Sequence, residues 1–146
     1  MGLTARQTPL IAATLRQLEH IEVDFSKSSL KPALFEAHKF AAPVAFSNGI
    51  IFTSEFVKKS EVLKAYFERI NFMPQRIVFV DDTKRHVEDL AHVFSALGVT
   101  VIGLHYPLVQ ARNTPWNQAK ANDIFEHCNH DTAVSDQRCR QAIEAY

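Results

Sequence analysis

Two adjacent carboxylates, Asp81 and Asp82, are the side chains of this chain with the clearest potential for chemistry. They follow an apolar run, residues 77–80, whose length and composition predict a strand buried on both faces. In open parallel sheets, ligands bind outside the carboxyl ends of the strands. Mg²⁺ prefers oxygen ligands, commonly one or two carboxylates together with phosphate oxygens. The pair therefore predicts a metal site, with Asp81 and Asp82 as ligands.

Two other interpretations of the pair were weighed. One aspartate can cap a helix that begins near Thr83, but capping explains only one of the two acids. Receiver domains of two-component systems also carry an Asp-Asp pair, near the N-terminus, and a phosphorylated aspartate at the end of a later strand. Here the pair lies past the middle of the chain, and no later aspartate ends a buried strand, so the receiver interpretation is rejected. The aspartates considered were Asp89, Asp123, Asp131 and Asp136.

The elements that must position the pair alternate between helix and strand. Apolar residues recur with helical spacing in three stretches, residues 10–18, 62–70 and 87–97, and we expect Thr8-Pro9 to open the first and Gly98 to close the third. Strands are predicted at residues 21–25, 76–80 and 99–106. Further helices are expected after Thr114-Pro115 and after Ser135-Asp136. Asn48-Gly49, between two apolar runs, predicts a tight β-hairpin because both turn residues tolerate positive φ.

This rhythm predicts an α/β fold: a Rossmann-like parallel sheet with flanking helices, incomplete, plus the hairpin around Asn48-Gly49. At 146 residues the chain has the length of one domain. We expect residues 1–146 to form a single partial domain, with about residues 107–146 as a C-terminal helical extension.

The composition excludes several classes of protein. Sixteen basic residues balance sixteen acidic ones, which gives no sign of a nucleic-acid-binding surface. No apolar run is long enough to span a membrane, and no signal segment is evident, so a cytoplasmic location is the default and the compartment stays open. Histidine, cysteine and aspartate cluster at residues 127–131, but the paired spacing of a zinc site is missing, and only Cys139 could complete a soft ligand set.

Three segments, in order, resemble the haloacid dehalogenase superfamily of phosphohydrolases. They are "GLTAR" (residues 2–6), "NGIIFTSEFVKKSEVLKAYF" (residues 48–67) and "RIVFVDDTKRHVEDL" (residues 76–90). More narrowly, they are similar to a group of bacterial members known only as a domain of unknown function. The resemblance implies a Rossmann-like sheet, Mg²⁺ and attack by an aspartate on a phosphorylated small molecule.

The resemblance also implies roles for four residues. Thr4 matches the hydroxyl that binds the transferring phosphoryl group, and Lys59 matches the lysine that offsets negative charge there. Asp81 matches a metal-binding acid, with Asp82 as a further ligand or as an anchor behind it. From the residues alone, Thr4 fits a turn equally well and Lys59 fits a solvated surface. A lysine at the start of a helix is nevertheless disfavoured by the helix dipole, which is consistent with a role in holding negative charge.

The chain departs from the family pattern at one decisive point. The nucleophile of the family is the first aspartate of an Asp-x-Asp pair, and no two aspartates of this chain are separated by one residue. Asp24 is followed by Ser26 at the position where a partner would stand. We therefore expect the C-terminal part of a longer phosphohydrolase, inactive by itself. The alternative is a non-catalytic binding or interaction module derived from the same fold.

The same departure bears on association. The strand that carries the Asp-x-Asp pair in the family lies beside the strand that ends at Asp81. Without it, the strand at residues 76–80 has an open apolar edge, and such edges tend to pair with other chains. We expect either a missing N-terminal segment or self-association to cover this edge.

Overall fold

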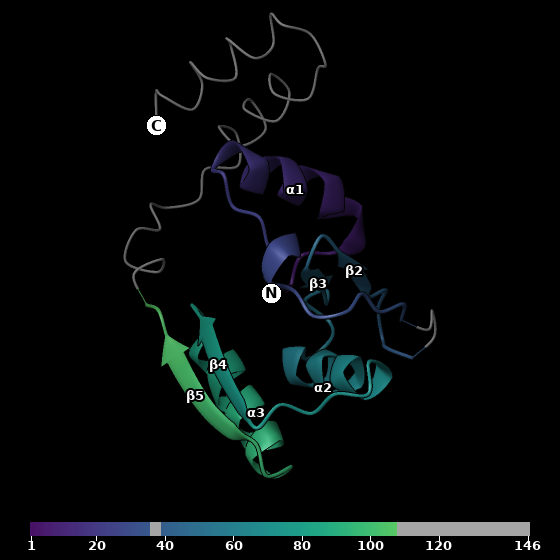
Figure 1. Ribbon diagram of the computed structural model, residues 1–146. Helices are drawn as coiled ribbons and strands as arrows, with labels where there is room; N and C mark the ends of the chain where they lie inside the picture. The colour runs from purple at the N-terminus through teal and green to yellow at the C-terminus, as the bar shows by residue number, and fades with distance from the viewer. Residues whose placement is uncertain (36–38, 108–146) are drawn as a thin grey trace, which may run out of the picture. The chain divides into compact units, whose positions relative to one another are not determined.

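The computed structural model describes residues 1–35 and 39–107, and residues 1–107 form one compact unit (Figure 1). The described elements are β1 (Gly2–Thr4), a 3₁₀ turn (Thr8–Leu10), α1 (Ile11–His20), a second 3₁₀ turn (Ser26–Ser28), β2 (Ala45–Ser47), β3 (Ile50–Phe52), α2 (Lys59–Arg69), β4 (Arg76–Asp81), α3 (Lys84–Ser95) and β5 (Thr100–His105). The predicted mixed α/β class is confirmed.

The strands of the described residues form two sheets rather than one. The first has the order β1-β3-β2, with β1 parallel and β2 antiparallel to β3. The second consists of β4 and β5 alone, paired in parallel from Arg76↔Thr100 to Asp81↔His105. The prediction that these two strands are parallel neighbours joined by a helix is therefore confirmed. A single Rossmann-like sheet remains a prediction.

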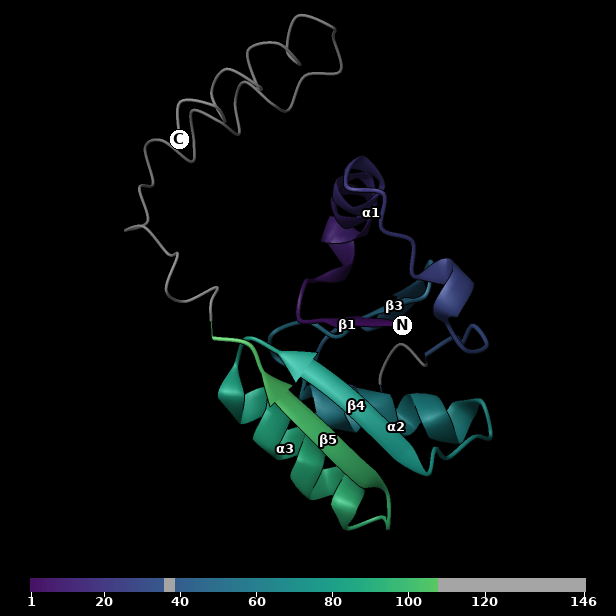
Figure 2. The same cartoon turned by 60° about the vertical axis from the view of Figure 1, so that its left-hand side comes forward.

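The crossover from β4 to β5 is made by α3, which lies against one face of the two strands (Figures 1 and 2). Gly103 allows a close approach here, since a side chain at this position would collide with the Cγ1 methyl of Val87. Gly98 has φ of +78° and ends α3, with the Val99 N–H donating to the Phe94 carbonyl at 3.0 Å. This bond is the signature of a helix closed by a left-handed residue, as predicted for Gly98.

The prediction that β4 and β5 are buried on both faces is wrong for the described residues. Phe79 is buried on the α3 side, whereas Val78 and Val80 on the opposite face are 61% and 58% exposed. Their cross-strand partners, Ile102 and Leu104, are exposed as well. A continuous apolar run gives no alternation by which one covered face can be distinguished from two.

Strands from both sheets and two helices share one apolar core. Buried side chains from β3, α2, β4 and α3 pack in a single cluster, among them Ile51, Val62, Phe79 and Leu90. Phe67 of α2 meets Phe94 of α3 edge to face, with ring centroids 5.8 Å apart. The packing of α2 on α3 therefore sets where the N-terminus of α2 lies beside the end of β4.

The predicted hairpin is confirmed. β2 and β3 are joined by Asn48 and Gly49, with φ of 46° and 78°, values that a two-residue turn of this kind requires. A side chain at position 49 would also collide with the backbone carbonyl of Phe25. The turn thus packs against the segment that follows α1.

Two local predictions are wrong. Residues 21–25 form no strand, because they close α1 instead: Glu22 has φ of 57°, and the Val23 N–H donates to the Leu18 carbonyl at 2.9 Å. Thr8 is no helix cap, since Gln7 holds that position and Thr8 lies within the first turn. Pro9 does stand at the start of the turn, where its missing N–H costs nothing.

Several predictions concern residues that the structure does not describe. The helices expected after residues 114 and 135, the cluster at residues 127–131 and Cys139 all lie outside the described residues. The helical extension at residues 107–146 accordingly remains a prediction.

Candidate functional site

Asp81 lies at the carboxyl end of β4 and is the most enclosed acid of the described residues. Its side chain is 4% exposed. One oxygen, Oδ2, accepts a hydrogen bond from Lys59 Nζ at 2.5 Å. The other, Oδ1, accepts the Thr83 backbone N–H at 2.8 Å and lies 3.2 Å from His86 Nδ1. Both oxygens are therefore held by donors from the starts of two different helices.

These partners determine the ionisation of Asp81. Burial acts to raise the pKa of the carboxyl, but the hydrogen bond from Lys59, the Thr83 N–H and the lysine charge outweigh it. The pKa of Asp81 therefore lies below its ordinary value, and the side chain is a carboxylate at neutral pH. The site is a buried ion pair at the end of a parallel strand.

Lys59 is the first residue of α2, as expected, and it is not a solvated surface lysine. Its side chain is only 11% exposed and points to Asp81. The helix start is held in place from α3, because Asp89 forms an ion pair with Lys58 at 3.3 Å and a hydrogen bond with the Ser60 hydroxyl. A cation at this end of a helix opposes the helix dipole, and the Asp81 carboxylate offsets that cost.

Thr4 ends β1, next to β3. Its carbonyl accepts the Thr53 backbone N–H at 2.8 Å, and its hydroxyl oxygen accepts the Arg6 backbone N–H at 3.3 Å. Because the oxygen already accepts one bond, the hydroxyl hydrogen is available to donate to a bound group. Thr4 therefore also takes part in a turn, as its residue type alone allowed, because its hydroxyl helps to shape the turn after β1.

Three of the four predicted residues line one cavity of about 650 Å³. Its walls include Thr4, Lys59 and Asp82, and Asp81 lies behind Lys59. The remaining lining comes from the turn after β1, the loop before α2 and the start of α3: Ala5, Arg6, Gln7, Pro9, Leu10, Glu55, Thr83 and His86. Residues more than 50 positions apart in the sequence are brought together at the carboxyl ends of β1 and β4.

Asp82 differs from Asp81 in being exposed at the rim of the cavity. Its carboxylate accepts a hydrogen bond from the Thr83 hydroxyl at 3.4 Å, and its backbone carbonyl lies 3.1 Å from His105 Nε2. Neither aspartate is the N-cap of α3, a position that Thr83 holds without a side-chain capping bond. The helix-cap interpretation therefore does not account for the pair.

The predicted magnesium ligands, Asp81 and Asp82, lie in the described part of the chain. No group of three or more His, Cys, Asp or Glu side chains in this part of the chain is placed to hold a metal ion. Both oxygens of Asp81 accept hydrogen bonds from nitrogen donors, and Oδ2, which accepts one from Lys59, keeps a further lone pair. Further oxygen ligands would be needed before Asp81 could hold Mg²⁺.

Sequence reasoning missed His86 and Glu55. His86 is close to Asp81 because the first turn of α3 folds back over the end of β4, and the spacing of five residues gave no motif. Glu55 lies in the loop before α2, where Gln7 Nε2 donates to its Oε1 at 3.4 Å. A hydrophobic pattern does not predict loop conformations of this kind.

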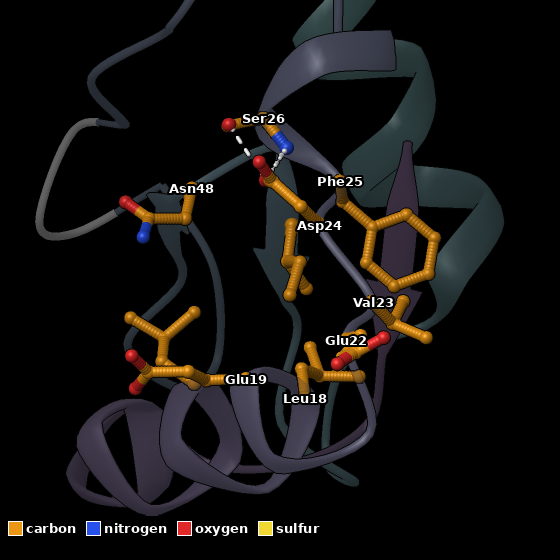
Figure 3. Close-up of a pocket in the computed structure, with 10 residues that line it drawn as sticks. Leu18, Glu19, Glu22, Val23, Asp24, Phe25, Ser26 and Asn48 are labelled. Atoms are coloured by element: carbon orange, nitrogen blue, oxygen red, sulfur yellow. Dashed lines mark hydrogen bonds between the residues drawn. The ribbon is translucent and has the colours of Figure 1, made fainter.

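A separate hollow of about 440 Å³ lies beside α1 and is acidic (Figure 3). Glu19, Glu22 and Asp24 line it, and Asp24 Oδ1 accepts hydrogen bonds from the backbone and hydroxyl of Ser26 at 2.8 and 2.6 Å. These bonds lower the pKa of Asp24. Asp24 therefore stabilises its own turn, and it does not line the cavity that Thr4 and Lys59 line.

Comparison with known proteins gives one match. A model of the family described as "Protein of unknown function (DUF2608)" matches residues 1–140. The chain belongs to this family. No curated protein and no solved structure matches the chain.

The match confirms that the chain belongs to a domain family of unknown function. It leaves the wider resemblance to haloacid dehalogenases untested. In the described part of the chain no helix has the length and apolar character needed to cross a membrane.

Proposed function

We propose that this chain supplies the phosphate-binding and charge-neutralising part of a magnesium-dependent phosphohydrolase of the haloacid dehalogenase type. The substrate class is a phosphorylated small molecule. Thr4 donates to the phosphoryl group, Lys59 offsets its charge, and Asp81 with Asp82 forms the acidic side of the site. The nucleophile comes from a segment that this sequence does not contain, so the chain by itself is inactive.

The observation that carries the proposal is the buried ion pair between Lys59 and Asp81 in the wall of a cavity that Thr4 also lines. Lys59 lies at the start of a helix, contacts the end of a strand and lines a cavity. A lysine with a structural role alone does not require all three of these locations. The low pKa of Asp81 keeps the pair charged at neutral pH. Preorganised charges of this kind are the main means by which proteins catalyse phosphoryl transfer.

The lack of a nucleophile is argued from the sequence and from the strand edges. No Asp-x-Asp pair occurs in the chain, and Asp24, the aspartate closest to that pattern, is bound to Ser26 in a turn. Within the described residues β1 pairs only with β3, and β4 pairs only with β5. One further parallel strand between the free edges of β1 and β4 would end at the cavity and would deliver its last side chains to it.

The added strand would also supply ligands for the metal. When bound, Mg²⁺ would neutralise charge on the phosphoryl group. Its ligands would be carboxylates of the added strand together with Asp81 or Asp82, because the described residues alone are too few. We propose magnesium only for this completed site.

The test is hydrolysis of p-nitrophenyl phosphate by residues 1–146, with and without a synthetic strand peptide of alternating apolar residues that ends in Asp-x-Asp. We expect no turnover above the Lys59→Ala level without the peptide, and magnesium-dependent turnover with it. A peptide ending in Asn-x-Asn is the matched control and should give none. Turnover by the chain alone that Asp81→Asn abolishes would overturn the proposal, and Asp24 would then be the first residue to mutate.

The alternative is a non-catalytic interaction module. It is favoured by the nitrogen donors on both oxygens of Asp81, because an acid with a structural role alone would be held in the same way. Binding of both peptides with equal affinity, without turnover from either, would support this alternative. If the free chain self-associates and either peptide dissociates these oligomers, this result would also support the interaction module.

A further inference from the structure

We propose that Arg6 forms a second anion-binding subsite, which selects substrates that carry a carboxylate or a second phosphate besides the phosphoryl group. The inference rests on the proposed function, because it takes the first anion to lie at Thr4 and Lys59. It adds a specificity-determining residue and narrows the substrate class to small molecules with two anionic groups.

The guanidinium of Arg6 is held in a fixed position by α1. Its Nη1 donates to Thr14 Oγ1 at 3.0 Å and to Gln17 Oε1 at 2.6 Å. Thr14 is buried, and its own hydroxyl hydrogen is used in a bond to the Leu10 carbonyl at 2.8 Å, so its oxygen meets Arg6 as an acceptor. Arg6 is exposed to solvent, and these two bonds to α1 set the direction in which its guanidinium lies.

Both groups that hold Arg6 are uncharged. Within the described residues no carboxylate forms an ion pair with it, whereas Lys59 is paired with Asp81 and Lys58 with Asp89. Arginine has five N–H donors, and the Nε and Nη2 donors make none of these bonds. A positioned, uncompensated guanidinium with free donors suits a planar carboxylate or a phosphate, which it can bind through two parallel hydrogen bonds.

The location of Arg6 links it to the phosphoryl site. Arg6 lines the cavity of about 650 Å³ that Thr4 and Lys59 also line, a volume in the range of sites that enclose small molecules. It also lines a neighbouring hollow of about 390 Å³, together with Thr4 and with Thr14 and Gln17, which bond its guanidinium. Arg6 and Thr4 therefore join the two hollows. The Arg6 backbone N–H also donates to the Thr4 hydroxyl, a bond that substitution of the side chain leaves intact. The side chain can thus be removed without dismantling the predicted phosphoryl site.

The experiment is calorimetric titration of the full chain with methylphosphonate, which has one anionic group, and with phosphonoacetate and methylenebisphosphonate, which have two. We expect the two-anion ligands to bind roughly tenfold more tightly than methylphosphonate, as one charge-assisted contact allows. Arg6→Gln should remove this preference and leave methylphosphonate binding unchanged. Arg16→Gln, which removes an exposed arginine from α1, the helix that bonds Arg6, should change neither.

Thr14→Val tests the positioning. It removes the acceptor that orients Arg6 and keeps the size of the side chain, so the preference should fall, and Thr14→Ser should restore it.

Three results would overturn the inference: equal affinity of the wild-type chain for all three ligands, equal loss for all three in Arg6→Gln, or no binding of any ligand. The last would overturn the proposed function as well. Binding that needs Arg6 and is unaffected by Lys59→Ala would overturn the proposed function, and with it the assignment of Arg6 as a second subsite. Absence of the preference for two anions in the wild-type chain, with methylphosphonate binding intact and dependent on Lys59, would overturn the inference alone.

Discussion

Two stretches of this chain look alike in sequence and fold differently. The first is residues 21–24, in which apolar and charged residues alternate, and the second is residues 76–81, which contain a continuous apolar run. Both stretches end in an aspartate. The second is a strand that delivers Asp81, 4% exposed, to a lysine. The first closes a helix and leaves Asp24, 43% exposed, bound to the serine two residues later.

The difference arises from what each stretch meets. The residues of β4 have a parallel partner, β5, and a helix that packs on them, so the extended backbone is hydrogen-bonded along one edge and covered on one face. Residues 21–23 follow directly on α1, and their N–H groups bond back to its last carbonyls. An apolar pattern of four or five residues thus becomes a strand only where a partner strand is available.

Lysine substitution gives the largest expected contrast between the two regions. Lys59→Ala leaves the Asp81 carboxylate buried and short of its charged partner, and we expect a loss of about 3 kcal/mol in the free energy of unfolding. Lys27→Ala removes the exposed partner of Asp24, 3.6 Å away, and should have no measurable effect. Urea denaturation of both variants provides the measurement.

A double variant, Lys59→Met with Asp81→Leu, separates the two causes of such a loss. It should recover much of the stability, because no buried charge remains unpaired. A loss in the double variant as large as in Lys59→Ala would show that packing, and not the charge, explains the effect.

Acidification should separate the regions next. The pKa of Asp81 lies below that of the unfolded chain, about 3.9, so the unfolded state takes up the proton first as the pH falls. The stability that the pair contributes is complete above this value and is lost as the pH drops through the pKa of the folded state. Unfolding free energies measured between pH 2.5 and 6 should therefore fall less steeply in Asp81→Asn than in the wild type. Asp24→Asn should reduce the slope less, because the pKa of Asp24 is also lowered but its carboxylate is exposed and screened by solvent. The opposite ranking would contradict the assignment of Asp81 as the buried acid.

The smallest expected effect is a gain in stability. Glu22 adopts φ of 57°, which a residue with a side chain adopts at a cost and glycine adopts freely. Glu22→Gly should therefore raise the free energy of unfolding by about 0.5–1 kcal/mol. His20→Gly, two residues earlier in the right-handed part of α1, should lower it by about 1 kcal/mol. Thermal unfolding of the two variants shows the sign of each change in the free energy of unfolding. Destabilisation by both substitutions would mean that residues 21–23 do not form the end of the helix.

Sequence reasoning found the elements that are locally determined. The Asn48-Gly49 turn, the closure of α3 at Gly98 and the strands around residues 77–80 and 100–104 followed from turn chemistry and apolar runs. It also named Thr4, Lys59 and Asp82, which share one cavity. Thr4 and Lys59 were found through a resemblance in three segments, whereas Asp82 was found from the apolar run that precedes it, and the roles of all three residues remain predictions.

The sequence did not reveal features that depend on tertiary contact. The exposed outer face of β4 and β5 has the same residue types as a buried one. His86 and Arg6 acquire their places from the fold of α3 and α1. Glu22 gave no warning of a left-handed conformation, because glutamate rarely adopts one.

The register of the two parallel pairs has a consequence for the order of folding. β4 and β5 join residues 24 positions apart, and β1 and β3 join residues 48 positions apart. Doubling the length of a closed loop adds about 0.6 kcal/mol to its entropic cost, and the shorter loop is already shortened by α3. The β4–α3–β5 segment therefore has the lower barrier to assembly. We therefore expect Asp81 to reach its place during folding before the strand that ends at Thr4 pairs with β3.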